Sequence, residues 1–123
     1  MNCKIVALDN FRRDAKRLVK KFPSLKDELF GLEQLLLLHP RAGVEITEST
    51  YKIRLAVKSK GKGKSGGMRV ITHVVEIELQ VETQEAEVTV FLLSIYDKSE
   101  EVNISDKELQ RLIEEAKDFS EGE

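Results

Sequence analysis

The chain has 123 residues, of which 41% are apolar and 34% charged, a composition typical of one globular domain and not of a disordered segment. Its 20 basic and 22 acidic residues give a net charge of −2, which by itself argues against a nucleic-acid partner. The single cysteine, Cys3, excludes an internal disulfide framework, and no stretch approaches the roughly 18 apolar residues of a membrane span.

The N-terminal half predicts one strand followed by two helices. Residues 4–8 form a short β-branched and apolar run that is typical of a strand. Apolar residues then recur at helical spacing over residues 11–21, until Pro23 interrupts the pattern. A second apolar stripe follows Ser24 and continues to about Leu38. Two helices joined by so short a turn are expected to form a helical hairpin.

The outer faces of the first predicted helix carry six cations. They are Arg12, Arg13, Lys16, Arg17, Lys20 and Lys21. A charged helix face of this kind indicates either an ordinary solvated surface or a second surface that contacts phosphates.

The C-terminal half changes to a period of two. Residues 51–58 alternate apolar and mostly cationic positions, which predicts a strand with two unlike faces. Residues 68–77 predict the next strand, and residues 88–96 are so apolar that we expect a central strand. Asn103 or Ser105 is positioned to cap a last helix.

The predicted order is therefore β-α-α-β-β-β-α, in a single domain over residues 1–118 with a frayed tail at 119–123. Consecutive strands pair most simply as an antiparallel meander. We expect an α+β fold with two layers: a small antiparallel sheet, a helical hairpin on one face and a C-terminal helix. The N-terminus lacks the features of a signal peptide, which favours a cytoplasmic protein.

The segment from Tyr51 to Arg69 is the exception to the acidic character of the chain. It contains no acid and seven bases, which are Lys52, Arg54, Lys58, Lys60, Lys62, Lys64 and Arg69. On the predicted strand, Lys52 and Arg54 project from the same side, and Arg69 can approach them from the next strand. Such a concentration of positive charge favours a polyanionic ligand.

This segment resembles two nucleotide-binding motifs, but the neighbouring residues do not fit either of them. Residues 61–66, GKGKSG, match the dinucleotide pattern G-x-G-x-x-G, yet a strand-like sequence follows where that motif needs a helix. A P-loop would need a glycine where Lys58 stands. No ligand-spaced Cys/His/Asp cluster predicts a metal site, and His73 is expected to be a hydrogen-bonded residue of the sheet.

Several stretches resemble the RelE/ParE superfamily of bacterial type II toxins, and within it the RelE/HigB-type branch. They are Y-K-I-R at residues 51–54, K-G-K-S-G-G-x-R-V-I at residues 62–71, Y-x-K at residues 96–98, and L-x-K-K-F-P-S-L in the helical hairpin. The block at residues 62–71 is the most specific of these. The chain departs from the family in its slightly acidic net charge and in lacking an aromatic or acidic residue at 102–104.

The resemblance implies a ribosome-dependent mRNA endonuclease that needs neither metal nor cofactor and is neutralised by a cognate antitoxin protein. The positions that match the family's catalytic residues are Lys52, Arg54, Arg69 and Lys98, and we expect Lys58, Lys60, Lys62, Lys64 and Tyr96 to bind the RNA. In this assignment Lys52 is the general base, Arg54 and Arg69 clamp the phosphate, and Lys98 assists the leaving 5′-oxygen. Tyr96 stacks on a base or orients Lys98.

Two alternatives remain open for the same fold. A ParE-like protein inhibits DNA gyrase without catalysing a reaction, and its basic loop would then be incidental. An inactive relative would bind RNA without being toxic.

Overall fold

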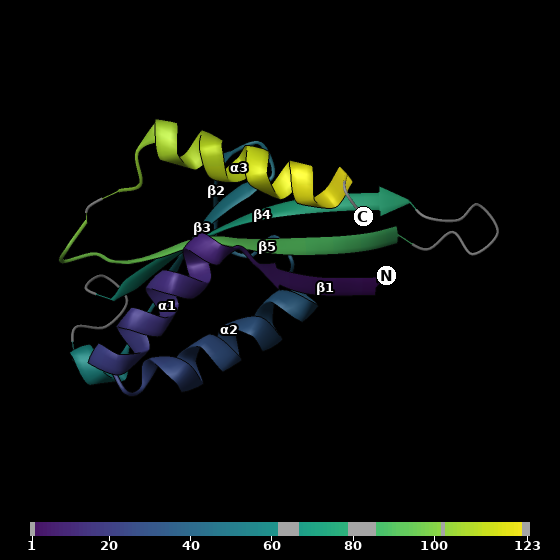
Figure 1. The fold of residues 1–123 in the computed structure, drawn as a ribbon. Coiled ribbons are helices and arrows are strands. Elements are labelled where there is room, and N and C mark those ends of the chain that lie inside the picture. The colour runs from purple at the N-terminus through teal and green to yellow at the C-terminus, as the bar shows by residue number, and fades with distance from the viewer. Residues whose placement is uncertain (1, 62–66, 79–85, 102, 122–123) are drawn as a thin grey trace.

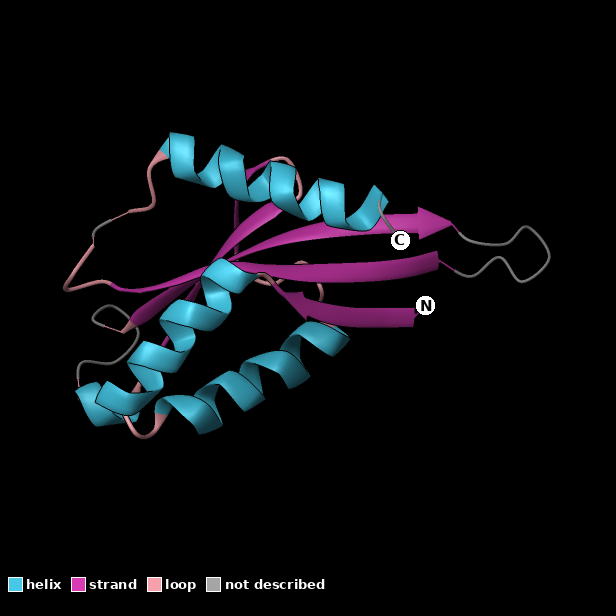
Figure 2. Ribbon diagram, viewed as in Figure 1, coloured by secondary structure: helices cyan, strands magenta, loops and turns pink. Residues whose placement is uncertain are grey.

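The protein folds into a mixed five-stranded sheet with helices on both faces (Figures 1 and 2). A computed structural model describes residues 2–61, 67–78, 86–101 and 103–121. The elements are β1 (Asn2–Ala7), α1 (Asp9–Lys21), α2 (Leu25–Leu38), β2 (Val44–Thr47), β3 (Thr50–Leu55), the short 3₁₀ helix η1 (Lys58–Lys60), β4 (Met68–Glu78), β5 (Ala86–Asp97) and α3 (Asp106–Glu121). The α+β class and the C-terminal helix are as predicted.

The strands lie in the order β1-β5-β4-β3-β2. β3, β4 and β5 form the expected antiparallel meander, and β5 is central as predicted, between β4 and β1. The prediction of a wholly antiparallel sheet was wrong at β1, which runs parallel to β5. No short turn connects these two strands, so neither turn geometry nor sequence distance sets their relative direction.

β2 is an additional edge strand that the sequence pattern does not predict. It pairs with β3 through a tight turn in which Ser49 adopts a positive φ of 53°. Gly43, just before the strand, has a φ of 100°, and a Cβ atom there would lie 2.6 Å from the carbonyl oxygen of Lys52. All four residues of β2 are exposed, so the strand lacks the buried run that makes other strands recognisable.

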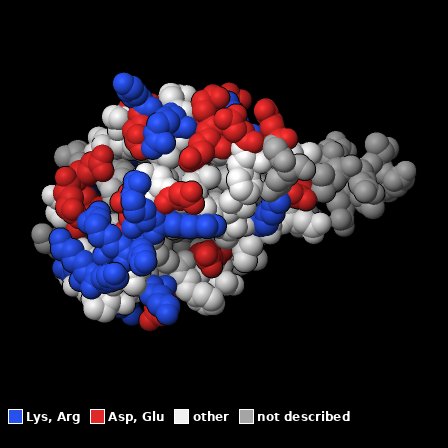
Figure 3. Space-filling model, in the orientation of Figure 1, with Lys and Arg blue, Asp and Glu red and all other residues white. Residues whose placement is uncertain are grey.

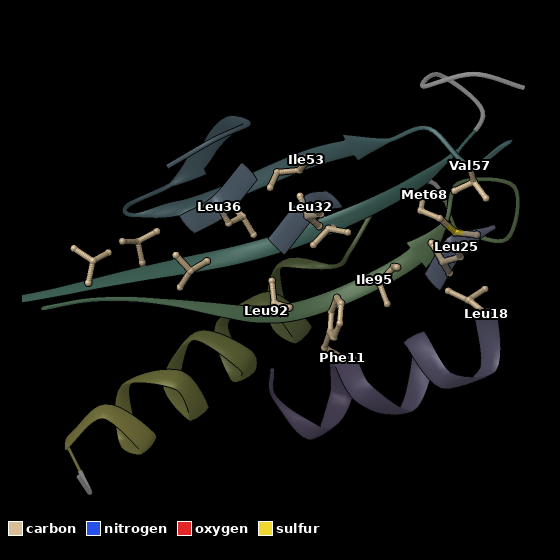
Figure 4. Packing of buried hydrophobic residues seen from close by; sticks show 14 residues of the cluster. Phe11, Leu18, Leu25, Leu32, Leu36, Ile53, Val57, Met68, Leu92 and Ile95 are labelled. Atoms are coloured by element: carbon tan, nitrogen blue, oxygen red, sulfur yellow. The ribbon is translucent and has the colours of Figure 1, made fainter. Parts of the chain in front are cut away.

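The helical hairpin packs on one face of the sheet, as predicted. Its apolar cluster includes Leu18, Leu25 and Leu36, which are fully buried against residues of β3, β4 and β5 (Figure 4). Full burial of one such leucine stabilises the fold by about 2–3 kcal/mol relative to leaving it exposed.

α3 covers the opposite face, so the predicted two-layer arrangement was wrong (Figure 1). A second cluster joins Leu112 and Ile113 of α3 to Ile71 of β4 and Phe91 of β5. β5 is apolar at consecutive positions because helices cover both of its faces. Ser105 caps α3, since its hydroxyl accepts a hydrogen bond of 3.2 Å from the backbone N–H of Glu108.

None of the helices in the described ranges has the length and apolar character needed to cross a membrane.

Candidate nucleic-acid interface

A row of three residues crosses the sheet near one end. Arg54 on β3 lies opposite Arg69 on β4, and Arg69 in turn lies opposite Tyr96 on β5. Residues directly opposite on antiparallel strands project from the same face. That face is the one covered by α3, because Tyr96 packs in the same cluster as the α3 residues.

Lys52 belongs to the neighbouring row on this face. It precedes Arg54 by two residues and lies opposite Ile71. The predicted placement of Lys52 and Arg54 on one side of the strand is therefore confirmed. The Arg54 side chain is exposed and Lys52 is half-buried. The Lys52 Nζ donates a hydrogen bond of 2.8 Å to Oδ1 of Asn103, a residue of the segment that joins β5 to α3.

Arg69 lies beneath this surface and not on it. Only 3% of the residue is exposed, and its Nη1 donates a hydrogen bond of 3.2 Å to the carbonyl oxygen of Met68. The prediction that Arg69 clamps a phosphate directly was wrong for this conformation, because the guanidinium is shielded from solvent. Its positive charge still acts on nearby groups, since a buried charge is poorly screened.

Tyr96 is also buried, with 4% exposure, so it cannot stack on an RNA base as predicted. Burial raises the pKa of its phenol, while the backbone of Ile104 and the charge of Arg69 act in the opposite direction. Among the described residues, the hydroxyl makes no hydrogen bond of good geometry, and its contact with the backbone of Ile104 is a weak one.

Lys98 follows the last residue of β5 and is exposed. Its backbone N–H donates to the carbonyl oxygen of Gly67 at 3.2 Å, which places it beside the beginning of β4. Because β4 lies between β5 and β3, the backbone of Lys98 is two strand spacings, roughly 10 Å, from the backbone of β3. The long side chains of Lys98 and Arg54 can therefore reach toward one ligand at this end of the sheet.

Lys60 was predicted to contact RNA, and the structure shows a different role. Its Nζ forms an ion pair with Asp97, and the two side chains are only 5% and 1% exposed. The same ammonium lies 5.1 Å from the centre of the Phe22 ring. Because the buried carboxylate of Asp97 requires a partner, the Lys60 ammonium stays paired with it in the interior and does not reach the surface to contact RNA.

Asp97 is held by further hydrogen bonds at the end of β5. Its Oδ1 accepts from the backbone N–H of Ser99 at 2.9 Å and from the Ser99 hydroxyl at 2.7 Å. Burial acts to raise the pKa of Asp97, but the hydrogen bonds from Lys60 and Ser99 outweigh it and hold the pKa below its ordinary value. This pair fixes η1 to the strand end that precedes Lys98.

The other lysines of the basic segment fall into two groups. Lys58 is exposed, and its backbone N–H donates to Oε2 of Glu28 at 2.7 Å, which leaves its ammonium at the surface. Lys62 and Lys64 lie outside the described residues, as does most of the glycine-rich stretch.

The cations of α1 form a second basic area, visible as a blue band over that helix in Figure 3. Arg17 reaches Glu100 at 3.5 Å, an exposed and therefore weak ion pair. Both interpretations of this helix face, a solvated surface and a phosphate-contacting one, are compatible with its exposure.

Sequence reasoning noted Asp97 in a polar group at the end of the last strand but gave it no role, and it gave Asn103 only a capping role. Asp97 is 37 positions from Lys60, and Asn103 is 51 positions from Lys52, so no local pattern connects either pair. An acid at the end of a mostly apolar strand was the one available signal for a buried partner. Among the described residues, no group of three His, Cys, Asp or Glu side chains is arranged to hold a metal ion.

The arrangement provides positive charge at one end of a rigid sheet, with Lys52, Arg54 and Lys98 accessible and Arg69 behind them. Such a site can bind a phosphate and stabilise charge that develops on it. A scan of the sequence against models of known protein families finds no match.

Proposed function

We propose that the protein is the toxin of a type II toxin–antitoxin pair and a RelE/HigB-like endonuclease that cuts mRNA on the ribosome. The observation that carries the proposal is the register of β3 and β4, which sets Lys52, Arg54 and Arg69 on one face of the sheet. The sequence resemblance supplies the reaction, and the cytoplasm would be its place of action.

The reaction requires no group beyond those of the chain and the RNA. The 2′-oxygen bonds to the adjacent phosphorus as its proton leaves, and the bond from phosphorus to the 5′-oxygen breaks as that oxygen gains a proton. The products are a 2′,3′-cyclic phosphate and a free 5′-hydroxyl. Lys52 takes the first proton as the neutral amine, after its ammonium has released a proton to water, and the ammonium of Lys98 supplies the second.

Charge on the phosphate is greatest midway through this reaction, and Arg54 is placed to stabilise it. Its guanidinium is exposed and presents several donors that suit phosphate oxygens. Arg69 adds positive charge from below, without contact, and Lys58 together with the residues 62–64 would bind the RNA backbone.

Mapping mRNA ends after induced expression tests the proposal. The wild-type chain should produce new 5′-hydroxyl ends within translated messages. Arg54→Ala should reduce the cleavage rate by roughly 100-fold, since loss of one donor to a developing oxyanion has that order of effect. Lys26→Ala is the matched control, because Lys26 is exposed on α2, which packs on the other face of the sheet.

Three results would count against the proposal or its site. Intact messages accompanied by DNA-damage signalling would indicate the gyrase inhibitor, and growth without any defect would indicate an inactive relative. Normal cleavage by Arg54→Ala would remove the residue from the site. A small DNA-binding protein encoded beside this chain is the expected antitoxin.

A further inference from the structure

A cavity of about 330 Å³ lies between α3 and the turn that joins β2 to β3. It is separate from the four residues assigned to catalysis. The side chains that matter for its chemistry are Glu48, His73, Val75, Gln110, Ile113 and Lys117. The three residues from α3 are spaced along one side of the helix, so the helix presents a continuous wall to the cavity.

Hydrogen bonding fixes the state of the His73 ring. Its Nδ1 lies 2.8 Å from Oγ1 of Thr50, and that hydroxyl donates its one proton to the carbonyl oxygen of Glu48 at 2.9 Å. The hydroxyl must therefore accept from His73, which assigns the ring proton to Nδ1. The other nitrogen, Nε2, is then an acceptor.

Several charged groups bear on the protonation of His73. Burial lowers the pKa of the imidazole, and the positive charges of Lys117 and Arg41 lower it further, while Glu48 raises it. The net effect is downward from the ordinary value, so the ring is neutral at pH 7 and Nε2 keeps its lone pair.

The free acceptor points to a ligand. His73 is 5% exposed, and within the described ranges its Nε2 makes no hydrogen bond. Nε2 is not among the buried polar atoms that lack a partner, so it faces the open cavity, where water or the edge of a ligand can donate a hydrogen bond to it. Val75 and Ile113 add apolar surface, and Gln110 and Lys117 add an amide and a cation. A flat ring with an N–H on its edge and a phosphate nearby fits these groups.

The cavity is next to the proposed cleavage site. The Thr50–His73 pair follows the Lys52–Ile71 pair along β3 and β4, on the same face of the sheet. Two residues along a strand span roughly 7 Å. A strand of RNA with its phosphate at Lys52 and Arg54 would bring a neighbouring base to this position.

We propose that the cavity at His73 is a nucleobase-binding pocket that gives the proposed nuclease its base preference, with Nε2 accepting from the base edge. The proposal rests on the function proposed above for the choice of ligand. Its geometry is independent of that function, so direct binding can be measured without catalysis.

Nuclear magnetic resonance of the imidazole rings provides this measurement. The chain has two histidines, and His39→Gln leaves His73 as the only imidazole signal. The four nucleoside 5′-monophosphates are added in turn, with ribose 5-phosphate and inorganic phosphate as probes that lack a base. We expect saturable shifts of the His73 Nε2 resonance with at least one nucleotide and none with either control probe. Shifts of equal size with ribose 5-phosphate, or none at about 10 mM nucleotide, would overturn the proposal.

A pair of variants then tests specificity. His73→Asn retains a donor near the position of Nδ1 and removes Nε2, whereas His73→Gln retains a polar group near the position of Nε2. The ratio of cleavage at preferred and other bases should fall roughly five- to tenfold in His73→Asn, the worth of one hydrogen bond, and stay near the wild-type ratio in His73→Gln. An unchanged ratio in His73→Asn would refute the pocket. If the wild-type chain cuts no RNA, the proposed function fails, and the resonance measurement still decides whether the pocket binds a base.

Discussion

Replacing Lys60 with methionine should destabilise the fold by about 3–5 kcal/mol at pH 7, the usual cost of leaving one buried charge without its partner. The magnitude follows from burial, since Lys60 and Asp97 are 5% and 1% exposed. Methionine fills a similar volume and keeps an apolar contact with Phe22, so the change chiefly removes the ammonium. Within the described part of the chain, the Asp97 carboxylate would retain its two hydrogen bonds from Ser99.

The effect should depend on pH with a definite sign. In the wild-type chain the pKa of Asp97 lies below its ordinary value of 3.8, so the unfolded chain binds the proton more readily. The contribution of Asp97 is therefore present above that ordinary value and is lost as pH falls through the folded-state pKa. Without Lys60, burial becomes the main influence and raises the pKa. The penalty in Lys60→Met should thus shrink as pH is lowered from 7 toward 4.

Urea denaturation at several pH values measures these differences. Lys58→Met is the matched control, because Lys58 is an exposed lysine of the same short helix and its replacement should change stability by less than about 0.5 kcal/mol. Adding Asp97→Asn to Lys60→Met should restore stability to within about 1–2 kcal/mol of the wild type, since no buried charge remains. Equal midpoints for Lys60→Met and Lys58→Met at pH 7 would refute the reasoning.

Two further predictions concern backbone strain and an unused hydroxyl. Gly43→Ala should lower the free energy of unfolding, measured by urea denaturation, by at least about 2 kcal/mol, because the φ is 100° and the new Cβ would meet the Lys52 carbonyl oxygen. Gly31→Ala, in an open helical position, should raise the free energy of unfolding by roughly 0.5–1 kcal/mol. Similar effects at both sites would contradict this account. Tyr96→Phe should change stability by less than about 1 kcal/mol, because among the described residues the hydroxyl has only a weak contact with the backbone of Ile104 and no hydrogen bond of good geometry. A loss above 1 kcal/mol in that variant would reveal a partner for the hydroxyl.

The sequence predicted the elements better than their arrangement. Periodicity identified both helices of the hairpin, the three strands of the meander and the central position of β5, because burial on one or two sides leaves a regular apolar pattern. The direction of β1 and the side covered by α3 depend on contacts between distant segments, for which the pattern carries no information. β2 escaped prediction because Val44 and Ile46 remain exposed on an edge strand.

The same distinction applies to the site. Alternation along β3 was enough to place Lys52 and Arg54 together, since strand period is a local property. Whether an individual cation is buried depends instead on packing between segments that are distant in the sequence. Arg69 and Lys60 have the same sequence character as their exposed neighbours, and only the packing of the strand ends and of Asp97 shows that both are interior.

Because Arg69 is buried, it cannot contact a phosphate directly, but its positive charge still belongs to the proposed site. Arg54 lies directly opposite and is exposed, so it can meet a phosphate while Arg69 contributes positive potential from a place that water screens poorly. At Lys52 the present partner is the neutral amide of Asn103. A phosphate would replace that neutral acceptor with an anionic one, which attracts the lysine ammonium more strongly. The two accessible cations are therefore arranged so that an anionic ligand competes favourably with the contacts already made.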